Sequence, residues 1–270
     1  MPASKIKNLI ILILALANLF LLALVLPARR EQAQRTQQEK AQIAALFAEA
    51  GVTLDAASVP QTQTLYPLEV TCSEEGQIAA VSSLLGEPVT QTQTAYALEL
   101  SGENGRATLE PSGALEVLFG GTTAAADVRS DAQTRLKETG LNCTALRLAD
   151  GGQTAFAYFT VSGAPIFTDP ATFTYKNDTL IRFSALLVVP QSVVRTDQTP
   201  VISAQDALLA FYGSRMETGW VGSSIIGVTQ GYTAKAAVEP QTVRLTPCWR
   251  IETDTGAFLI DGITAAVSAE

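Results

Sequence analysis

The sequence contains no histidine, and this absence removes several kinds of active site. Without an imidazole that titrates near neutral pH, the chain cannot run a Ser-His-Asp or Cys-His mechanism or build a histidine-bearing zinc site. Cysteine is scarce as well. Cys72, Cys143 and Cys248 are far apart and form no CxxC pair, which excludes a zinc ribbon or a thioredoxin-type motif. We expect no disulfide, no metal and no cofactor.

Charged residues are also few. Only 16% of the residues are charged, whereas 47% are hydrophobic, and the formal net charge is −8. Soluble domains usually carry about 25% charged residues, so part of the chain is expected to avoid water. An acidic chain with a pI near 4.7 is not expected to bind nucleic acid.

The hydrophobic excess lies in residues 9–26, which are apolar except for Asn18. As a helix this segment spans roughly 27 Å, enough for a bilayer core. Because it lacks a small-residue cleavage site, we interpret it as an uncleaved signal anchor rather than a signal peptide. Residues 1–30 are then a cytoplasmic tail and a single transmembrane helix. The flanking charges do not settle the orientation, but the short tail favours an extracytoplasmic C-terminal domain.

Asn18 lies in the middle of this span. An amide in hydrocarbon requires a partner, and an interhelical hydrogen bond there is worth about 0.6–2 kcal/mol. We therefore expect Asn18, Leu19 and Phe20 to contact a second transmembrane helix. Residues 31–51 follow as a polar helical stalk, in which Ile43, Leu46 and Phe47 are spaced to dock on the domain beyond.

The fold class is α+β, with antiparallel sheets each covered by a helix. We divide the outer part into modules at 52–125, 126–196 and 197–270. Each contains one helix, and these are expected to begin after Ser73, near Val128 and after Ser203, with Gly213 ending the third. Pro190 to Pro200 is the best linker candidate.

No group of residues in the sequence is a strong candidate for a catalytic site. The adjacent carboxylates Glu74/Glu75 and Asp254/Asp261 are better explained by a helix N-terminus and a β-turn than by catalysis. Cys72 precedes a helix but has no histidine partner. Trp220, between two glycines, is expected to be exposed and is a weak partner-binding candidate in the outer domain. We therefore expect a protein that is not an enzyme.

The N-terminal region resembles a known family. Ser4-Lys5-Ile6-Lys7 leads into the span, and Asn18-Leu19-Phe20 lies at its centre, as in YycI/YycH-type accessory regulators of low-GC Gram-positive bacteria. Gly51-Val52-Thr53-Leu54 is similar to the stretch before the first strand of that family. The resemblance implies a cell-envelope regulator that binds a membrane sensor histidine kinase of a two-component system, with a homologous accessory membrane protein as a possible further partner.

The third module also resembles this family. It extends from Ser203-Ala204-Gln205-Asp206-Ala207 to Pro247-Cys248-Trp249-Arg250-Ile251 and is similar to PepSY-type modules as well. It departs from the PepSY order at Asp261-Gly262-Ile263-Thr264-Ala265. Three hypotheses follow: a non-enzymatic regulator of a sensor kinase, a PepSY-like inhibitor or chaperone of an exported peptidase, and an envelope enzyme that uses carboxylates.

Overall fold

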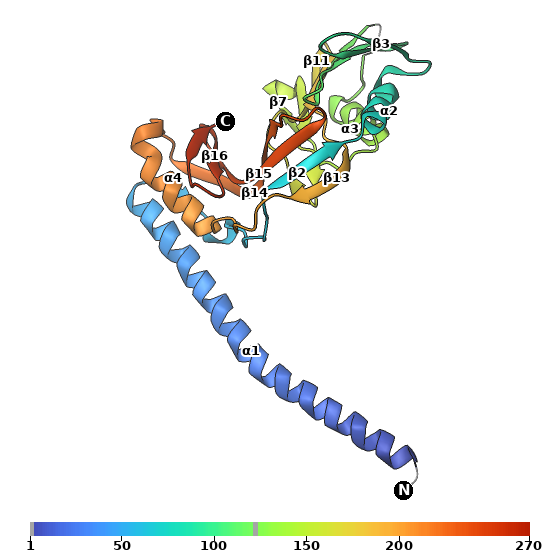
Figure 1. The fold of residues 1–270 in the computed structure, drawn as a ribbon. Helices are drawn as coiled ribbons and strands as arrows, with labels where there is room; N and C mark the ends of the chain where they lie inside the picture. The colour runs from blue at the N-terminus through green and yellow to red at the C-terminus, as the bar shows by residue number, and fades with distance from the viewer. Residues whose placement is uncertain (1–2, 121–123) are drawn as a thin grey trace.

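The computed structural model describes the backbone of residues 3–120 and 124–270, and the side chains of these residues outside 3–10, 21–33 and 216. Its first element is a single helix, α1 (Ala3–Glu49), which leaves the rest of the molecule as a long arm (Figure 1). The expected span and the expected stalk are therefore parts of one helix.

The side chains of residues 9, 10 and 21–26 of the expected span lie outside the described set. Among the residues that are described, no helix has an apolar stretch long enough to cross a membrane. The transmembrane segment at 9–26 stays a prediction.

Eight antiparallel strands form the larger sheet, in the order β3-β4-β5-β6-β12-β11-β8-β7. Their bounds are β3 Thr90–Gln93, β4 Leu98–Gly102, β5 Gly105–Leu109, β6 Ala114–Phe119, β7 Arg147–Ala149, β8 Thr154–Ala157, β11 Ala171–Lys176 and β12 Thr179–Leu186. Helices α2 (Glu74–Leu85) and α3 (Val128–Glu138) pack their apolar sides against it. Alternate strand side chains point into this core, because successive residues of a strand face opposite sides.

Seven strands form the second sheet, whose main path is β1-β14-β15-β16-β17. The bounds are β1 Thr53–Leu54, β2 Leu68–Cys72, β13 Pro190–Arg195, β14 Ser224–Ala236, β15 Thr242–Thr253, β16 Gly256–Asp261 and β17 Val267–Ala269. The long strand β15 pairs with β2 through its first residues and with β16 through its last. Helix α4 (Ala204–Thr218) and the end of α1 cover this sheet and share its core.

A third buried cluster joins the two sheets. It gathers residues of β2, β14 and β15 with the hairpin of β9 (Thr160–Val161) and β10 (Ala164–Pro165). Beside it, the Phe167 amide donates to the Tyr232 carbonyl at 2.8 Å. Two short 3-10 helices, η1 (Ala56–Ser58) and η2 (Asp150–Gly152), lie in connections. Buried contacts therefore hold the sheets together.

The α+β class and the starts of the three outer helices are confirmed. Ser73 and Ser203 accept backbone hydrogen bonds as N-caps, and Ser203 with Asp206 forms a capping box. The expected end at Gly213 is wrong, because α4 continues to Thr218. Gly219, with φ of 65°, supplies the left-handed C-cap instead.

The expected linker at Pro190 to Pro200 is also wrong. Its first six residues form the exposed edge strand β13, which pairs with β2. Proline is compatible with the first position of an edge strand, where its missing N–H is not needed. Nor do the sheets follow the boundaries at 52–125, 126–196 and 197–270. Strand β6 of the first module pairs with β12 of the second, and β2 of the first pairs with β15 of the third.

Candidate functional site

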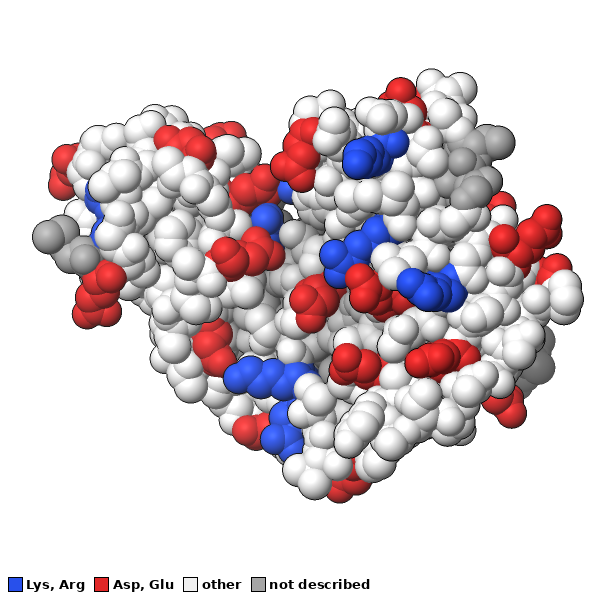
Figure 2. All heavy atoms as spheres, turned by 90° about the horizontal axis from the view of Figure 1, so that it is seen from above, with Lys and Arg blue, Asp and Glu red and all other residues white. Residues whose placement is uncertain are grey.

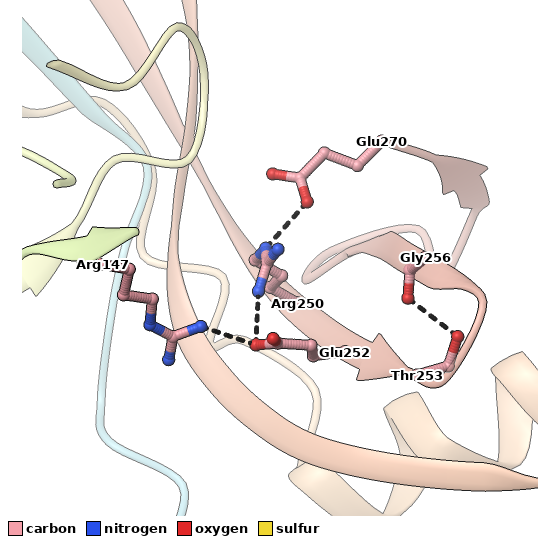
Figure 3. Close-up of polar contacts among 6 residues, drawn as sticks. All are labelled: Arg147, Arg250, Glu252, Thr253, Gly256 and Glu270. Atoms are coloured by element: carbon pink, nitrogen blue, oxygen red, sulfur yellow. Dashed lines mark hydrogen bonds and ion pairs between the residues drawn. The ribbon is translucent and has the colours of Figure 1, made fainter. Parts of the chain in front are cut away.

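Two arginines and two glutamates form one network where the two sheets meet (Figure 3). Arg147 Nη1, from β7, donates to Glu252 Oε2 of β15 at 2.8 Å. Arg250 lies two residues earlier on β15, and hence on the same face. Its Nη1 donates to the same Glu252 oxygen at 3.0 Å, and its Nε donates to Glu270 Oε2 at 2.8 Å. The network ties an edge of the larger sheet to the second sheet.

The network keeps its members charged. Burial by itself would lower the pKa of Arg250, but Glu270 and Tyr158 outweigh it, so this pKa lies above its ordinary value. Burial would raise the pKa of Glu252, but the hydrogen bonds and charges of Arg147 and Arg250 hold it below its ordinary value. Each charge is satisfied by a neighbour, so the arrangement is suited to positioning rather than to proton transfer. Beside it, Thr253 Oγ1 donates to the Gly256 carbonyl and closes the β15–β16 turn.

A groove adjoins this network. One part, with a volume of about 520 Å³, has an apolar wall made mainly of Phe156, Tyr158, Phe167 and Leu259. A second hollow of about 440 Å³ lies over β6 and β12 of the larger sheet and shares the Asp169-to-Thr172 segment with the first. Figure 2 shows one face of the molecule, which is hollowed between two lobes and has acidic and basic side chains intermixed around the hollow.

The predicted partner-binding residues of the span lie on the protruding arm. Among residues 11–20, the large apolar side chains are 54–67% exposed, including those of Leu19 and Phe20. Asn18 is exposed as well and has no hydrogen bond to any residue that the structure describes. No other part of the chain that the structure describes covers this apolar surface.

The other end of α1 is anchored in the domain, as its apolar spacing predicts. Ile43 and Phe47 are buried in the core of the second sheet, and Leu46 is partly buried. The Phe47 ring meets Tyr212 of α4 edge-on, with centroids 5.3 Å apart. The docking of the stalk on the outer domain is thereby confirmed.

The expected exposure of Trp220 is wrong, since this side chain is only 7% exposed. Its ring packs against Phe211 with centroids 4.9 Å apart, and its Nε1 donates to Thr255 Oγ1 at 2.9 Å. The flanking glycines indicated a loop, but they carry no information about which way the indole turns. Trp220 is a core residue whose polar nitrogen is satisfied.

The carboxylates of the acidic pairs make hydrogen bonds that have structural roles. Asp254 accepts from the Ser223 amide and hydroxyl and so joins its turn to the segment before β14, whereas Asp261 accepts from the Ile263 and Thr264 amides and closes its own turn. Glu74 accepts from Gln241 at the start of α2. No group of three metal-ligating side chains occurs within the described part of the chain.

All three cysteines are free thiols. Burial raises the pKa of Cys72 and of Cys248, and it raises the pKa of Cys143 to about 12. A thiolate is therefore disfavoured at each position.

Sequence reasoning missed the network of Arg147, Arg250, Glu252 and Glu270. The i, i+2 spacing of Arg250 and Glu252 in a strand was a usable signal, because it places opposite charges on one face. Arg147 lies 105 positions from Glu252 in the sequence, and nothing local to it indicates that pairing.

No protein-family model and no curated protein matches this sequence. Among solved structures, an uncharacterized protein from Eubacterium rectale is similar over 78% of this chain and 86% of its own, with a TM-score of 0.45 and 8% identity. YycH from Bacillus subtilis is similar over 71% of this chain, with a TM-score of 0.41 and 11% identity. The match covers 52% of YycH, so the chain spans about half of that protein. At these scores neither structure assigns a function or a site.

Proposed function

We propose that this protein is a non-enzymatic, membrane-anchored accessory regulator that binds and modulates a sensor histidine kinase of a cell-envelope two-component system. The observation that carries the proposal is α1. This one helix exposes apolar side chains at residues 11–20 and buries Phe47 in the core of the outer domain. The choice of a kinase as partner rests on the resemblance of the sequence to the YycI/YycH-type regulators.

The exposed surface of α1 favours a lipid environment. It includes Ile11, Leu12, Ile13, Leu14, Leu16, Leu19 and Phe20, all more than half exposed. Burying side chains of this size is worth about 1.5–3 kcal/mol each, so leaving them in water would be costly. In a bilayer they would be covered, and the Asn18 amide would then need a polar partner on another helix.

The anchored end of α1 supplies a route for coupling. A continuous helix is stiff, so a contact made at Asn18 is connected through the backbone to Ile43 and Phe47. A regulator of this kind would bind one state of the kinase better than the other and shift the population between them. The outer domain would lie outside the cell, and a homologous accessory membrane protein would be a further partner.

The absence of enzymatic activity remains part of the proposal. Its support is that the carboxylates of Asp254 and Asp261 are committed to loop amides, and that the thiols are held in their protonated form.

The experiment is co-purification in mild detergent of tagged full-length protein from the membranes of its own source. A matched variant carries residues 9–26 in scrambled order, which preserves composition and mean hydropathy. We expect a histidine kinase to co-purify with the natural chain and to be recovered in much smaller amount with the scrambled one. Equal recovery would contradict a contact in the span. A peptidase recovered with both chains would instead favour the inhibitor or chaperone hypothesis.

A further inference from the structure

The groove between the sheets has an open apolar end that none of the described residues covers. Phe156 and Leu259 are only partly buried there, beside the more deeply set rings of Tyr158 and Phe167. Tyr158 and Phe167 meet edge-on with centroids 5.2 Å apart, and Phe156 meets Tyr158 in the same way at 5.9 Å. These contacts fix the wall, so the cavity of about 520 Å³ is present before any ligand arrives.

The wall is also fixed from behind. The Arg250 guanidinium lies 5.7 Å from the Tyr158 ring centroid and is held by Glu252 and Glu270. Phe167 is pinned through its backbone to Tyr232. A preformed site loses little conformational entropy when it binds.

The charges around the groove are unequal. Arg182 is paired with Glu116 at 2.8 Å, and Arg250 is paired with Glu252 and Glu270, so the basic groups are neutralised. Asp169 lines both hollows, is exposed, and its carboxylate makes no hydrogen bond or ion pair with the described residues. Glu110 lines the second hollow, and among the described residues its carboxylate accepts a hydrogen bond from the Ser112 hydroxyl alone. The charge that remains unpaired in the groove is therefore negative.

We propose that this groove binds an extended segment of a partner protein in which an aromatic or large aliphatic side chain lies next to lysine or arginine. The apolar end takes the hydrophobic side chain, and Asp169 and Glu110 face the cationic groups. This occupant is chosen for charge complementarity, since an acidic segment would be repelled. The inference goes beyond the regulatory role proposed above, which depends on α1, and does not rest on it.

The test is fluorescence anisotropy with the full chain in micelles of an uncharged detergent. The probe is a short labelled peptide of alternating phenylalanine and lysine. Two control peptides replace lysine with glutamate or phenylalanine with serine, and empty micelles report binding to detergent. We expect saturable binding of the first peptide alone, weakened by added salt.

Two substitutions locate the binding. Asp169→Asn removes a charge but suits the positive φ of 44° at this position, because asparagine tolerates the left-handed region. We expect binding about threefold weaker, as for an exposed ion pair. Leu259→Ser should weaken it about tenfold through the loss of apolar contact. The matched control is Asp178→Asn, at an exposed position with φ of 60° in the turn at the other end of β11, which should bind normally.

The idea is overturned by absence of binding at concentrations up to about 1 mM. It is equally overturned if Asp169→Asn and Asp178→Asn bind alike, or if the glutamate peptide binds as well as the lysine peptide. Thermal unfolding of each variant reports whether it is folded. If Leu259→Ser does not fold, Asp169→Asn alone still tests the proposal. Kinase recovery, measured separately, fails or succeeds independently of the peptide result.

Discussion

Phe47 of α1 and Phe211 of α4 stack with ring centroids 6.5 Å apart and planes inclined by 22°, and both side chains are fully buried. This pair joins the arm to the outer domain. Together with buried Ile43, it packs the C-terminal end of α1 on the domain, so the helix that carries residues 11–20 is joined to the domain by packing. The regulatory proposal depends on this connection, because a loose tether transmits no preference between two states of a partner.

Replacing Phe47 with alanine should release the end of α1. Deleting a buried phenylalanine ring costs about 3–5 kcal/mol, through lost transfer free energy and the cavity left behind. We expect faster amide hydrogen exchange in residues 43–49 and a lower free energy of unfolding of the outer domain, measured in denaturant. Glu49→Ala, at an exposed position two residues away, is the control and should change neither quantity. Unchanged exchange in Phe47→Ala would show that the packing is not what holds the arm.

Replacing Asn18 with leucine should reduce recovery of the kinase from membranes. The loss of one interhelical hydrogen bond is worth about 0.6–2 kcal/mol, or roughly threefold to thirtyfold in affinity. Asn18→Gln keeps an amide and should retain part of the binding. Leu14→Ile, one helical turn earlier, leaves the surface apolar and serves as the control. Unchanged recovery of the kinase with Asn18→Leu would exclude this residue as the contact.

The network of Arg147, Arg250, Glu252 and Glu270 should make the stability of the fold depend on pH. The pKa of Glu252 is depressed in the folded state, so its contribution is present above the ordinary value of 4.5. It is lost as the pH falls through the lower folded pKa, where the carboxylate takes up a proton. Glu252→Gln removes this contribution at neutral pH. The difference in unfolding free energy from the natural protein should therefore be largest near pH 7 and shrink below 4.5.

Denaturation curves at several pH values check this prediction. Glu239→Gln, at an exposed carboxylate with no ion pair to the described residues, is the control. If the difference for Glu252→Gln were the same at pH 3 and pH 7, the ion pairs with Arg147 and Arg250 would not be stabilising.

The three thiols should be unreactive in the native protein. Burial raises the pKa of each, so little thiolate exists at pH 8, and Cys72 and Cys248 are also inaccessible. A chromogenic disulfide reagent should titrate none of them rapidly in buffer and all three in denaturant. Rapid reaction of one thiol in the native protein would reopen a nucleophilic role.

The local pattern of the sequence predicted much of the fold. Ser73 and Ser203 marked two helix starts, and the spacing of Ile43 and Phe47 predicted the docking of α1. These signals work because caps and helical periodicity act over a few residues. The pairing of β2 with β15 joins residues about 170 positions apart, and nothing in either segment specifies it.

The site was less predictable than the fold. Trp220 lies between glycines, which indicated a loop, yet its indole turns inward onto Phe211. Asp169 and Phe156 belong to one groove only because β8 and β11 pair in the larger sheet. Surfaces assembled from distant strands depend on topology, which local spacing does not encode.

The most direct test of the regulatory account measures the kinase itself. Once co-purification has identified it, the kinase is reconstituted in vesicles with and without the full chain, and incorporation of labelled phosphate is followed. We predict that the full chain changes the rate at least about fivefold, and that Phe47→Ala loses most of this change while remaining in the membrane. Identical phosphorylation rates with and without the natural chain would contradict the account.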